Sequence, residues 1–358
     1  MIRLITTTRS RRFVLIASAI ICFAYVDAVV AQKLEPIPPA NVAGESPDQI
    51  KQIYKLTKAA SKIEDYELII QRCQKQLKQT LKSKDHKYLE SLIVWSNNRI
   101  GQQHFQNSVS MKETGLNRQA EEELQRAIHI FDELISDSPL TWRAWFNRAR
   151  IHAMRGEFEP ALEKFIEVTK LKRDHPAAWF NAAEICLQLN RNEEAIEFYS
   201  RSIKMDPTDV QALTGRGHAS LASKEFLNAI ADYKTVIKLQ PSDEFALSNL
   251  ADAYFATEMW DEARLHYESA AKTENATLGK VRLANFLIGC GDKKQRDSKR
   301  AVTLAKQAVE TAGPSVPFLT ILAAAYSANG QNDMAKQTQK LRESLELRAA
   351  RKQEPITK

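Results

Sequence analysis

A period of 34 residues runs without insertion or deletion from residue 142 to residue 277, and it constrains the fold more than any other feature of the chain. Four times at this interval an alanine is followed, four residues later, by an aromatic residue. In the first half of each unit, a large apolar residue precedes a small one by four residues. Such a fixed period predicts a repeat architecture. The alanine and ring pairs are Ala161/Phe165, Ala195/Tyr199, Ala229/Tyr233 and Ala263/Tyr267, and the large and small pairs are Trp145/Ala149, Trp179/Ala183, Leu213/Gly217 and Leu247/Ala251.

The spacing within one unit predicts two amphipathic helices of about 12 to 15 residues, joined by a short turn. We number the places of a repeat from its first residue. Small residues at the eighth and twentieth places let the two helix backbones approach, and the ring at the twenty-fourth place fills the space between them. Because one helix pair cannot bury its apolar side alone, neighbouring units must stack. The expected fold is therefore an all-α solenoid.

The alternation of large, small and aromatic residues, with Pro207 and Pro241 closing two of the units, resembles the tetratricopeptide repeat (TPR). This resemblance implies a right-handed superhelix of about seven antiparallel helix pairs, expected here over residues 48–349. It also implies a concave binding surface rather than a catalytic centre. The whole chain resembles exported bacterial TPR proteins of the cell envelope. The clear repeats are 142–175, 176–209, 210–243 and 244–277.

Degenerate units are expected on both sides of the clear block. A first helix pair is predicted over about residues 50–83, and a stretched unit with lengthened helices follows over about residues 89–139. Between Cys290 and Arg300 another unit carries about five added residues, and Asp297 or Ser298 is the expected N-cap of its second helix. The last unit, 316–349, has a polar second helix that is typical of a terminal cap. Residues 350–358 are expected to form a tail.

The N-terminus has the build of a secretory signal peptide. Four arginines precede an apolar run over residues 13–25, and Val29 to Ala31 offers small or modest residues before Gln32. We expect residues 1–31 to be the signal peptide and residues 32–47 to be a Pro-rich linker. The alternative is an uncleaved membrane anchor, although a spanning helix needs about 20 apolar residues. Either outcome places the chain in the periplasm or cell envelope.

Charge and cysteine content point to no special partner. The chain carries a net charge of +7, of which the predicted signal peptide contributes +3 and leaves +4. The charges alternate in sign along the helices, as on solvated surfaces, so a nucleic acid partner is not expected. Three cysteines remain outside the signal peptide, which is too few and too sparse for a disulfide framework. Cys73 and Cys186 occupy core positions of their units and are expected to be buried thiols.

The sequence contains no motif for catalysis or for a cofactor. It has no Walker loop, H-E-x-x-H, paired C-x-x-C or G-x-S-x-G, and its seven histidines are scattered. We therefore expect no enzyme activity, no metal and no cofactor. The basic segment from Lys293 to Arg300 is interpreted as a solvated loop, with contact to an acidic surface or anionic lipid as the alternative. The chain is expected to contact a membrane through its N-terminal segment only if that segment is uncleaved.

In the family that the pattern resembles, places 2, 5, 9, 12 and 13 of the first helix face the concave groove. Rings at these places are not needed between the two helices, so we expect exposed rings that anchor an extended or helical peptide. Packing of these rings against neighbouring helices is the alternative. Charges of both signs at these places favour an amphipathic ligand of mixed charge. The candidate groove residues are Arg143, Phe146, Arg150, Phe180, Glu184, His218, Phe245, Asp252 and Phe255.

Three asparagines at the sixth place, Asn147, Asn181 and Asn249, complete the candidate set. They resemble the asparagine ladder in the repeat half of O-linked N-acetylglucosamine transferases. There, side-chain amides hold a peptide backbone, because an amide both donates and accepts hydrogen bonds. Gly215 interrupts the series here, and we expect no transferase catalytic domain to follow. A shared repeat consensus is the preferred interpretation.

These observations favour a non-enzymatic scaffold of the cell envelope that binds a peptide or protein segment in the groove of a solenoid. Two alternatives remain open. The first alternative is a structural envelope protein that self-associates through its ends. The second is a regulatory subunit of a transferase encoded elsewhere. The polar last helix argues against end-to-end stacking.

Overall fold

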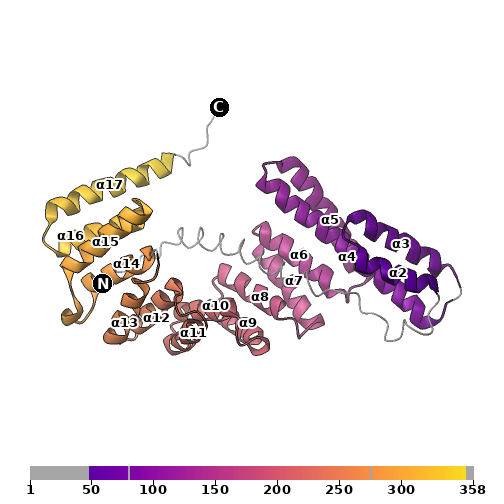
Figure 1. The fold of residues 1–358 in the computed structure, drawn as a ribbon, viewed down its shortest axis with the longest axis horizontal. Coiled ribbons are helices and arrows are strands. Elements are labelled where there is room, and N and C mark those ends of the chain that lie inside the picture. The colour runs from indigo at the N-terminus through magenta and orange to yellow at the C-terminus, as the bar shows by residue number, and fades with distance from the viewer. Residues whose placement is uncertain (1–47, 80, 275, 352–358) are drawn as a thin grey trace. The chain divides into compact units, whose positions relative to one another are not determined.

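The computed structural model describes residues 48–79, 81–274 and 276–351 of the 358-residue chain. Within this part the structure contains sixteen α-helices, labelled α2 to α17, one short 3-10 helix and no strand (Figure 1). The predicted all-α fold is confirmed. The predicted signal peptide 1–31, the linker 32–47 and residues 352–358 of the predicted tail lie outside the described residues.

The described chain divides into two compact units, residues 48–191 and residues 192–351. The N-terminal unit begins with a short helix pair and continues with two long helices. Their length accounts for the residues added in the stretched unit, as predicted. The helices of this unit are α2 Asp48–Ala59, α3 Ile63–Leu77, α4 Ser83–Glu113, α5 Asn117–Asp137, α6 Trp142–Met154, α7 Phe158–Leu171 and α8 Pro176–Gln188.

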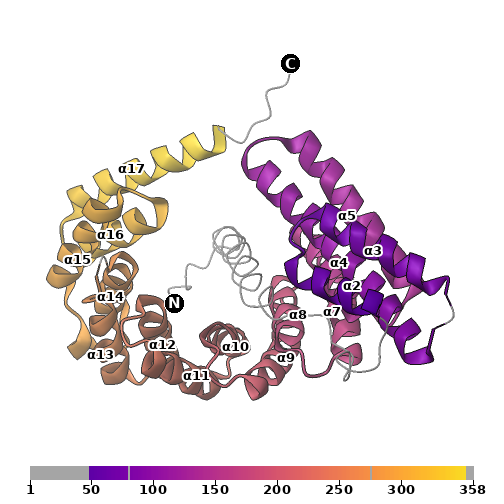
Figure 2. The same cartoon turned by 45° about the vertical axis from the view of Figure 1, so that its right-hand side comes forward.

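In the C-terminal unit, α10, α12 and α14 lie along one side and α11, α13 and α15 along the other (Figure 2). The helices are α9 Asn192–Met205, α10 Val210–Ala222, α11 Phe226–Leu239, α12 Glu244–Ala256, α13 Trp260–Ala270, α14 Thr277–Gly289, α15 Ser298–Ala312, α16 Val316–Ala328 and α17 Asn332–Arg351, and the 3-10 helix η1 spans Lys293–Gln295. Sixteen helices make eight pairs, so the estimate of about seven was one pair too low.

The added residues of the seventh pair form a compact turn. η1 lies within them, and the Asp292 carboxylate accepts a hydrogen bond from the backbone N–H of Lys294 at 2.9 Å. Asp297 is the N-cap of α15, as expected, and its carboxylate accepts from the backbone N–H of Arg300 at 2.9 Å. Such a cap satisfies one of the free donors at the start of a helix. The insertion therefore ends where α15 begins.

The small residue at place 8 packs against the ring at place 24 of the same repeat. A Cβ atom built on Gly217 would lie 2.8 Å from Cζ of Tyr233, a ring that is fully buried. The stretched unit uses the same contact, because a Cβ on Gly101 would lie 2.7 Å from Cε1 of Phe131. Contact between a small residue and a ring thus sets how closely the two helices of a pair approach.

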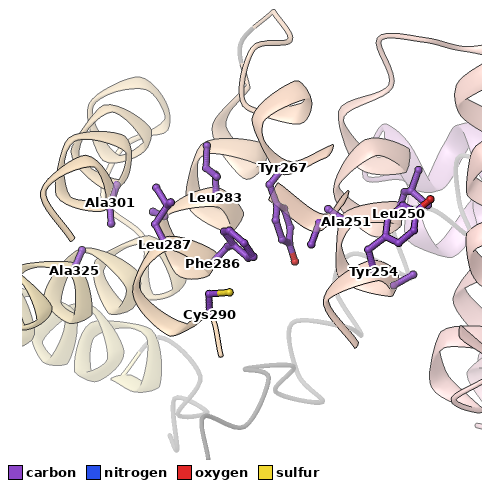
Figure 3. Close-up of a cluster of buried hydrophobic side chains, with 14 of the residues drawn as sticks. Leu250, Ala251, Tyr254, Tyr267, Leu283, Phe286, Leu287, Cys290, Ala301 and Ala325 are labelled. Atoms are coloured by element: carbon purple, nitrogen blue, oxygen red, sulfur yellow. The ribbon is translucent and has the colours of Figure 1, made fainter. Parts of the chain in front are cut away.

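Rings also connect neighbouring repeats into one core. Tyr267 of α13 lies between Ala251 of α12 and Phe286 of α14 (Figure 3), and the centroids of the Tyr267 and Phe286 rings are 5.4 Å apart. Cys290 lies buried at the end of α14, in the same cluster. The predicted burial of Cys73 and Cys186 is confirmed, and burial raises the pKa of the Cys73 thiol to about 12. These thiols are core side chains.

A second series of small residues, which the sequence analysis did not single out, lies at place 3 of the first helices. Ala144, Ala178, Ala212 and Ala246 hold this place and are buried, and Gly279 holds it in α14. A Cβ on Gly279 would lie 2.6 Å from the carbonyl carbon and oxygen of Ala270. The backbones of α13 and α14 therefore approach too closely for any side chain at this place.

Within the described residues, no helix combines the length and the apolarity that a membrane span requires.

We expect Gly279→Ala to destabilise the protein. Glycine to alanine normally favours a helix by about 1 kcal/mol. Here the new methyl group meets backbone atoms that cannot move aside, and overpacking costs about 1–3 kcal/mol. Lys280→Ala, at the next and only partly buried position, serves as the control and should change the free energy of unfolding by less than about 0.5 kcal/mol. Urea denaturation measures both variants, and an unchanged or raised stability for Gly279→Ala would contradict this packing.

Candidate functional site

Two of the predicted groove rings, Phe146 of α6 and Phe180 of α8, are buried. Their exposed fractions are 5% and 4%. The Phe146 ring packs edge-on against Phe165 of α7, with centroids 5.5 Å apart, and stacks on His175 at 5.2 Å. The prediction that these rings are exposed is therefore wrong for both. Phe146 is covered by the ring of its own repeat and by the residue that precedes α8.

The two predicted groove arginines, both in α6, are held against aromatic rings. The Arg143 guanidinium lies over the Trp142 ring, 4.5 Å from its centroid, and burial lowers the pKa of Arg143. The buried Arg150 lies over the Phe105 ring of α4 at 5.1 Å. Cation–π contacts of this kind hold a guanidinium in a fixed position. Glu184 of α8 is half-buried.

The three asparagines at place 6 make three different hydrogen bonds and form no common ladder. Asn147 donates to Oδ1 of Asn98 in α4 at 3.2 Å, and Asn181 donates to the carbonyl of Ala177 in its own helix at 2.7 Å. Asn249 donates to Nε2 of His218 at 2.8 Å. All three side chains belong to buried residues. Their amides are already engaged within the protein.

The structure also explains why the asparagine series stops at Gly215. A Cβ at this position would collide with the ring of Tyr199, which belongs to the preceding repeat. Tyr199 and Gly215 are both buried. Only glycine leaves enough room for that ring, so an asparagine is excluded at this place. Packing against the Tyr199 ring therefore determines that residue 215 is glycine.

In the C-terminal unit, hydrogen bonds join α10, α12 and α14 along one side. From α12, Asn249 contacts His218 of α10, and its Oδ1 accepts from Nη1 of Arg282 in α14 at 3.0 Å. The same guanidinium forms an ion pair with Asp252. We call the side of α10, α12 and α14 that carries these residues the first-helix face. It links three consecutive repeats through fixed polar contacts.

Asp252 is the most strongly held group of this network. Its Oδ1 accepts from the Tyr267 hydroxyl at 2.5 Å, while Oδ2 faces Arg282. Burial raises the pKa of Asp252, and the Arg282 charge and the Tyr267 hydroxyl act in the opposite direction. About 28% of both the Asp252 and the Arg282 side chain remains exposed. The pair is therefore positioned by the core and still reachable from outside.

Arg282 was missed by the sequence analysis. Counted from Thr277, where α14 begins and the preceding repeat ends, Arg282 falls at the sixth place, as Asn249 does when counted from the start of α12. The uninterrupted pattern ends at residue 277, and the sequence analysis carried no candidate position into the stretched unit that follows. The signal was present, since both residues stand at the same place of consecutive repeats.

Of the four predicted groove rings, only Phe245 is an exposed ring. Its exposed fraction is 59%, and it lies four residues before Asn249 and therefore on the same side of α12. Phe255 is half-buried and packs against Trp260 at 5.2 Å and Phe286 at 6.1 Å. His218 is exposed next to the network. The first-helix face thus combines one accessible ring with held polar groups.

The described residues contain no group of three or more His, Cys, Asp or Glu side chains arranged to hold a metal ion. The first-helix face contains a carboxylate, a guanidinium, an amide and an imidazole that hydrogen-bond or pair with one another. Groups in this arrangement can recognise a polar ligand.

A family model for the tetratricopeptide repeat matches residues 113–169, 155–210 and 214–277. The chain is a tetratricopeptide repeat protein. Tetratricopeptide repeats generally serve as modules of protein–protein interaction, and they identify the chain as a protein–protein interaction scaffold. The match includes the clear repeats that the sequence period defined.

A solved TPR structure shares the fold. The C-terminal part of a TPR protein from Cytophaga hutchinsonii aligns with a TM-score of 0.51 at 16% identity and covers 68% of this chain and 93% of that one. The pilF protein of Pseudomonas aeruginosa gives 0.46 at 18% identity, covering 63% and 98%. YrrB, described as a TPR protein with an unusual peptide-binding site, gives 0.44 at 14%, covering 53% and 96%. No curated protein sequence matches the chain significantly.

We expect the stability of the protein to decrease as the pH is lowered. The group responsible is His175, which is buried between Phe146 and Trp142. Its pKa is lowered from 6.5 to about 4, chiefly by burial; the charges of Arg143 and Lys172 act in the same direction, and a backbone hydrogen bond and Asp174 act in the opposite direction. Protonation therefore favours the unfolded chain, so stability present above pH 6.5 is lost as the pH falls towards 4. The loss is on the order of 1–3 kcal/mol.

Replacing His175 with Phe keeps the ring contacts and removes the titrating group. Thermal midpoints measured between pH 7 and pH 4.5 should fall less steeply for His175→Phe than for the parent protein. His129→Phe changes an exposed histidine of α5 and should leave the slope unchanged. Equal slopes for the parent protein and His175→Phe would show that His175 does not titrate in this way.

Proposed function

We propose that this protein binds a peptide or a segment of another protein on the first-helix face of its C-terminal unit. The observation that carries the proposal is Phe245, a large ring left 59% exposed beside the network of Asn249, Arg282 and Asp252. Aromatic residues that are accessible and rigidly supported are frequent anchors of protein interfaces. Phe245 would contribute the apolar contact of such an interface.

The polar groups of this face set the chemistry of the ligand. Arg282 is partly exposed and offers donors, Asp252 offers an acceptor, and the exposed His218 lies at the far end of the network. Since both charge signs lie within one hydrogen-bonded chain, an amphipathic segment of mixed charge fits better than a uniformly charged one. The groups hold one another in place, which reduces the entropy lost when a ligand binds. The ligand is therefore an amphipathic segment with an apolar side chain for Phe245.

We also propose that the protein acts in the cell envelope after export. Support comes from the basic leader and the apolar run over residues 13–25, which lie outside the described residues. N-terminal sequencing of the protein recovered from its native cells tests this. We expect the recovered chain to begin at Gln32, and a chain that retains the apolar run and fractionates with soluble cytoplasmic proteins would contradict export.

The binding face is tested by photo-crosslinking in the native cells, with a benzoylphenylalanine placed at Phe245. Leu265 of α13 provides a matched control, because its exposed fraction is 60% and it lies on a second helix (Figure 2). We expect a discrete adduct from the Phe245 position and none from the Leu265 position. Mass spectrometry of the adduct then identifies the partner.

Adducts from both positions, or from neither, would contradict binding at the first-helix face. Equal labelling would mean that contact follows exposure alone. Absence of any adduct would mean that Phe245 faces solvent in the cell.

A further inference from the structure

The last repeat contains an open pocket. It has a volume of about 450 Å³ and lies between α16 and α17. Ala323, Ala324 and Ala335 contribute apolar side chains to its lining. Lys336, Gln339 and Arg342 of α17 lie around it.

The last repeat lacks the ring that the clear repeats carry at place 24, and the residue at that place lines the pocket. In repeat 244–277, places 8, 20 and 24 are Ala251, Ala263 and Tyr267, and all three are buried. With Val316 as the first place, the same places of the last repeat are Ala323, Ala335 and Gln339. The two alanines are only half-buried and Gln339 is exposed. A glutamine does not fill the space that a ring fills elsewhere.

In the preceding repeats, the first helix of the next repeat covers this side of the helix pair. α14 packs on α12 and α13, and α16 packs on α14 and α15. In each case the first helix of one repeat covers the open side of the pair before it. The side of α16 and α17 that carries the pocket is therefore shaped to receive a helix.

The charge around the pocket selects the kind of helix. Lys336 and Arg342 line the pocket, and no carboxylate does. The carboxylates nearest to Arg342 are those of Glu343 and Glu346 on its own helix, at 3.9 and 3.8 Å. Neither of them lines the pocket. Two cations without a facing acid favour an acidic ligand.

We propose that this pocket docks an acidic amphipathic helix of a partner protein, which inserts an apolar side chain between α16 and α17. The inserted side chain takes the space of the missing ring, and acidic residues beside it meet Lys336 and Arg342. This site is separate from the first-helix face and does not depend on the function proposed for that face.

Two helices of the chain itself provide matched probes. The α12 peptide, Glu244–Ala256, contains Glu244 and Asp252 and no basic residue, whereas the α14 peptide, Thr277–Gly289, contains Lys280 and Arg282 and no acid. Within the protein, the α12 segment packs on α11, and the α14 segment packs on α12 and α13. We expect the fluorescently labelled α12 peptide to bind the full chain about tenfold more tightly than the α14 peptide by anisotropy. Equal affinities, or tighter binding of the α14 peptide, would overturn the proposal.

Gln339→Phe restores the ring of the other repeats and fills the pocket. We expect this variant to have an unchanged or higher thermal midpoint and to lose binding of the α12 peptide. The thermal midpoint shows that the variant is folded, so the loss cannot come from unfolding. Undiminished binding by Gln339→Phe would show that the peptide does not enter the pocket.

The charge requirement is tested by Lys336→Glu, with Lys340→Glu as the control. Both lysines are exposed on α17, and only Lys336 lines the pocket. We expect Lys336→Glu to weaken binding of the α12 peptide severalfold more than Lys340→Glu does. Equal effects of the two substitutions would show that the peptide is held by general electrostatic attraction. They would contradict a defined site.

Two further outcomes would assign the pocket to another occupant and would contradict docking of a partner helix. Sedimentation that shows a dimer of the parent protein and a monomer of Gln339→Phe would assign it to a second copy of this chain. A chain shortened after Arg351 that binds the α12 peptide more tightly would assign it to residues 352–358.

Discussion

Contact between a small residue and an aromatic ring within each repeat is the constraint on which the rest of the structure depends. At Gly217 and Tyr233 there is no room for even one additional methyl group without movement of a buried ring. This contact fixes how closely the two helices of a pair approach, and the rings then reach into the next pair, as Tyr267 does towards Phe286. Stacking of pairs is therefore a consequence of how each pair is packed.

The sequence predicted this part of the structure well, because the contacts that define a pair lie at fixed spacings along the chain. The long helices α4 and α5, the Asp297 cap and the buried thiols followed from the same pattern. The place-3 series, with Gly279 against the Ala270 backbone, was less visible. Alanine is common in helices, and only the structure shows how close the neighbouring backbone is.

Prediction of the candidate site was weaker, because exposure depends on residues from other helices. Phe146 was expected to be accessible, but it is covered by Phe165 and His175. Phe245 holds place 2 of its repeat, whereas Phe146 holds place 5, and Phe245 remains exposed. The sequence analysis assigned both places to the groove and did not distinguish them. Arg282 and the open pocket beside Gln339 lie beyond the regular pattern, where position-based reasoning ended.

The central claim is that the first-helix face of the C-terminal unit binds a partner through Phe245. The most direct measurement compares the proteins recovered from native cells by two tagged alanine variants, Phe245→Ala and Leu265→Ala, which remove side chains of nearly equal exposure. A specific partner should be retained by Leu265→Ala and reduced about tenfold or more with Phe245→Ala, as for an interface anchor. Equal recovery by both variants would contradict the claim.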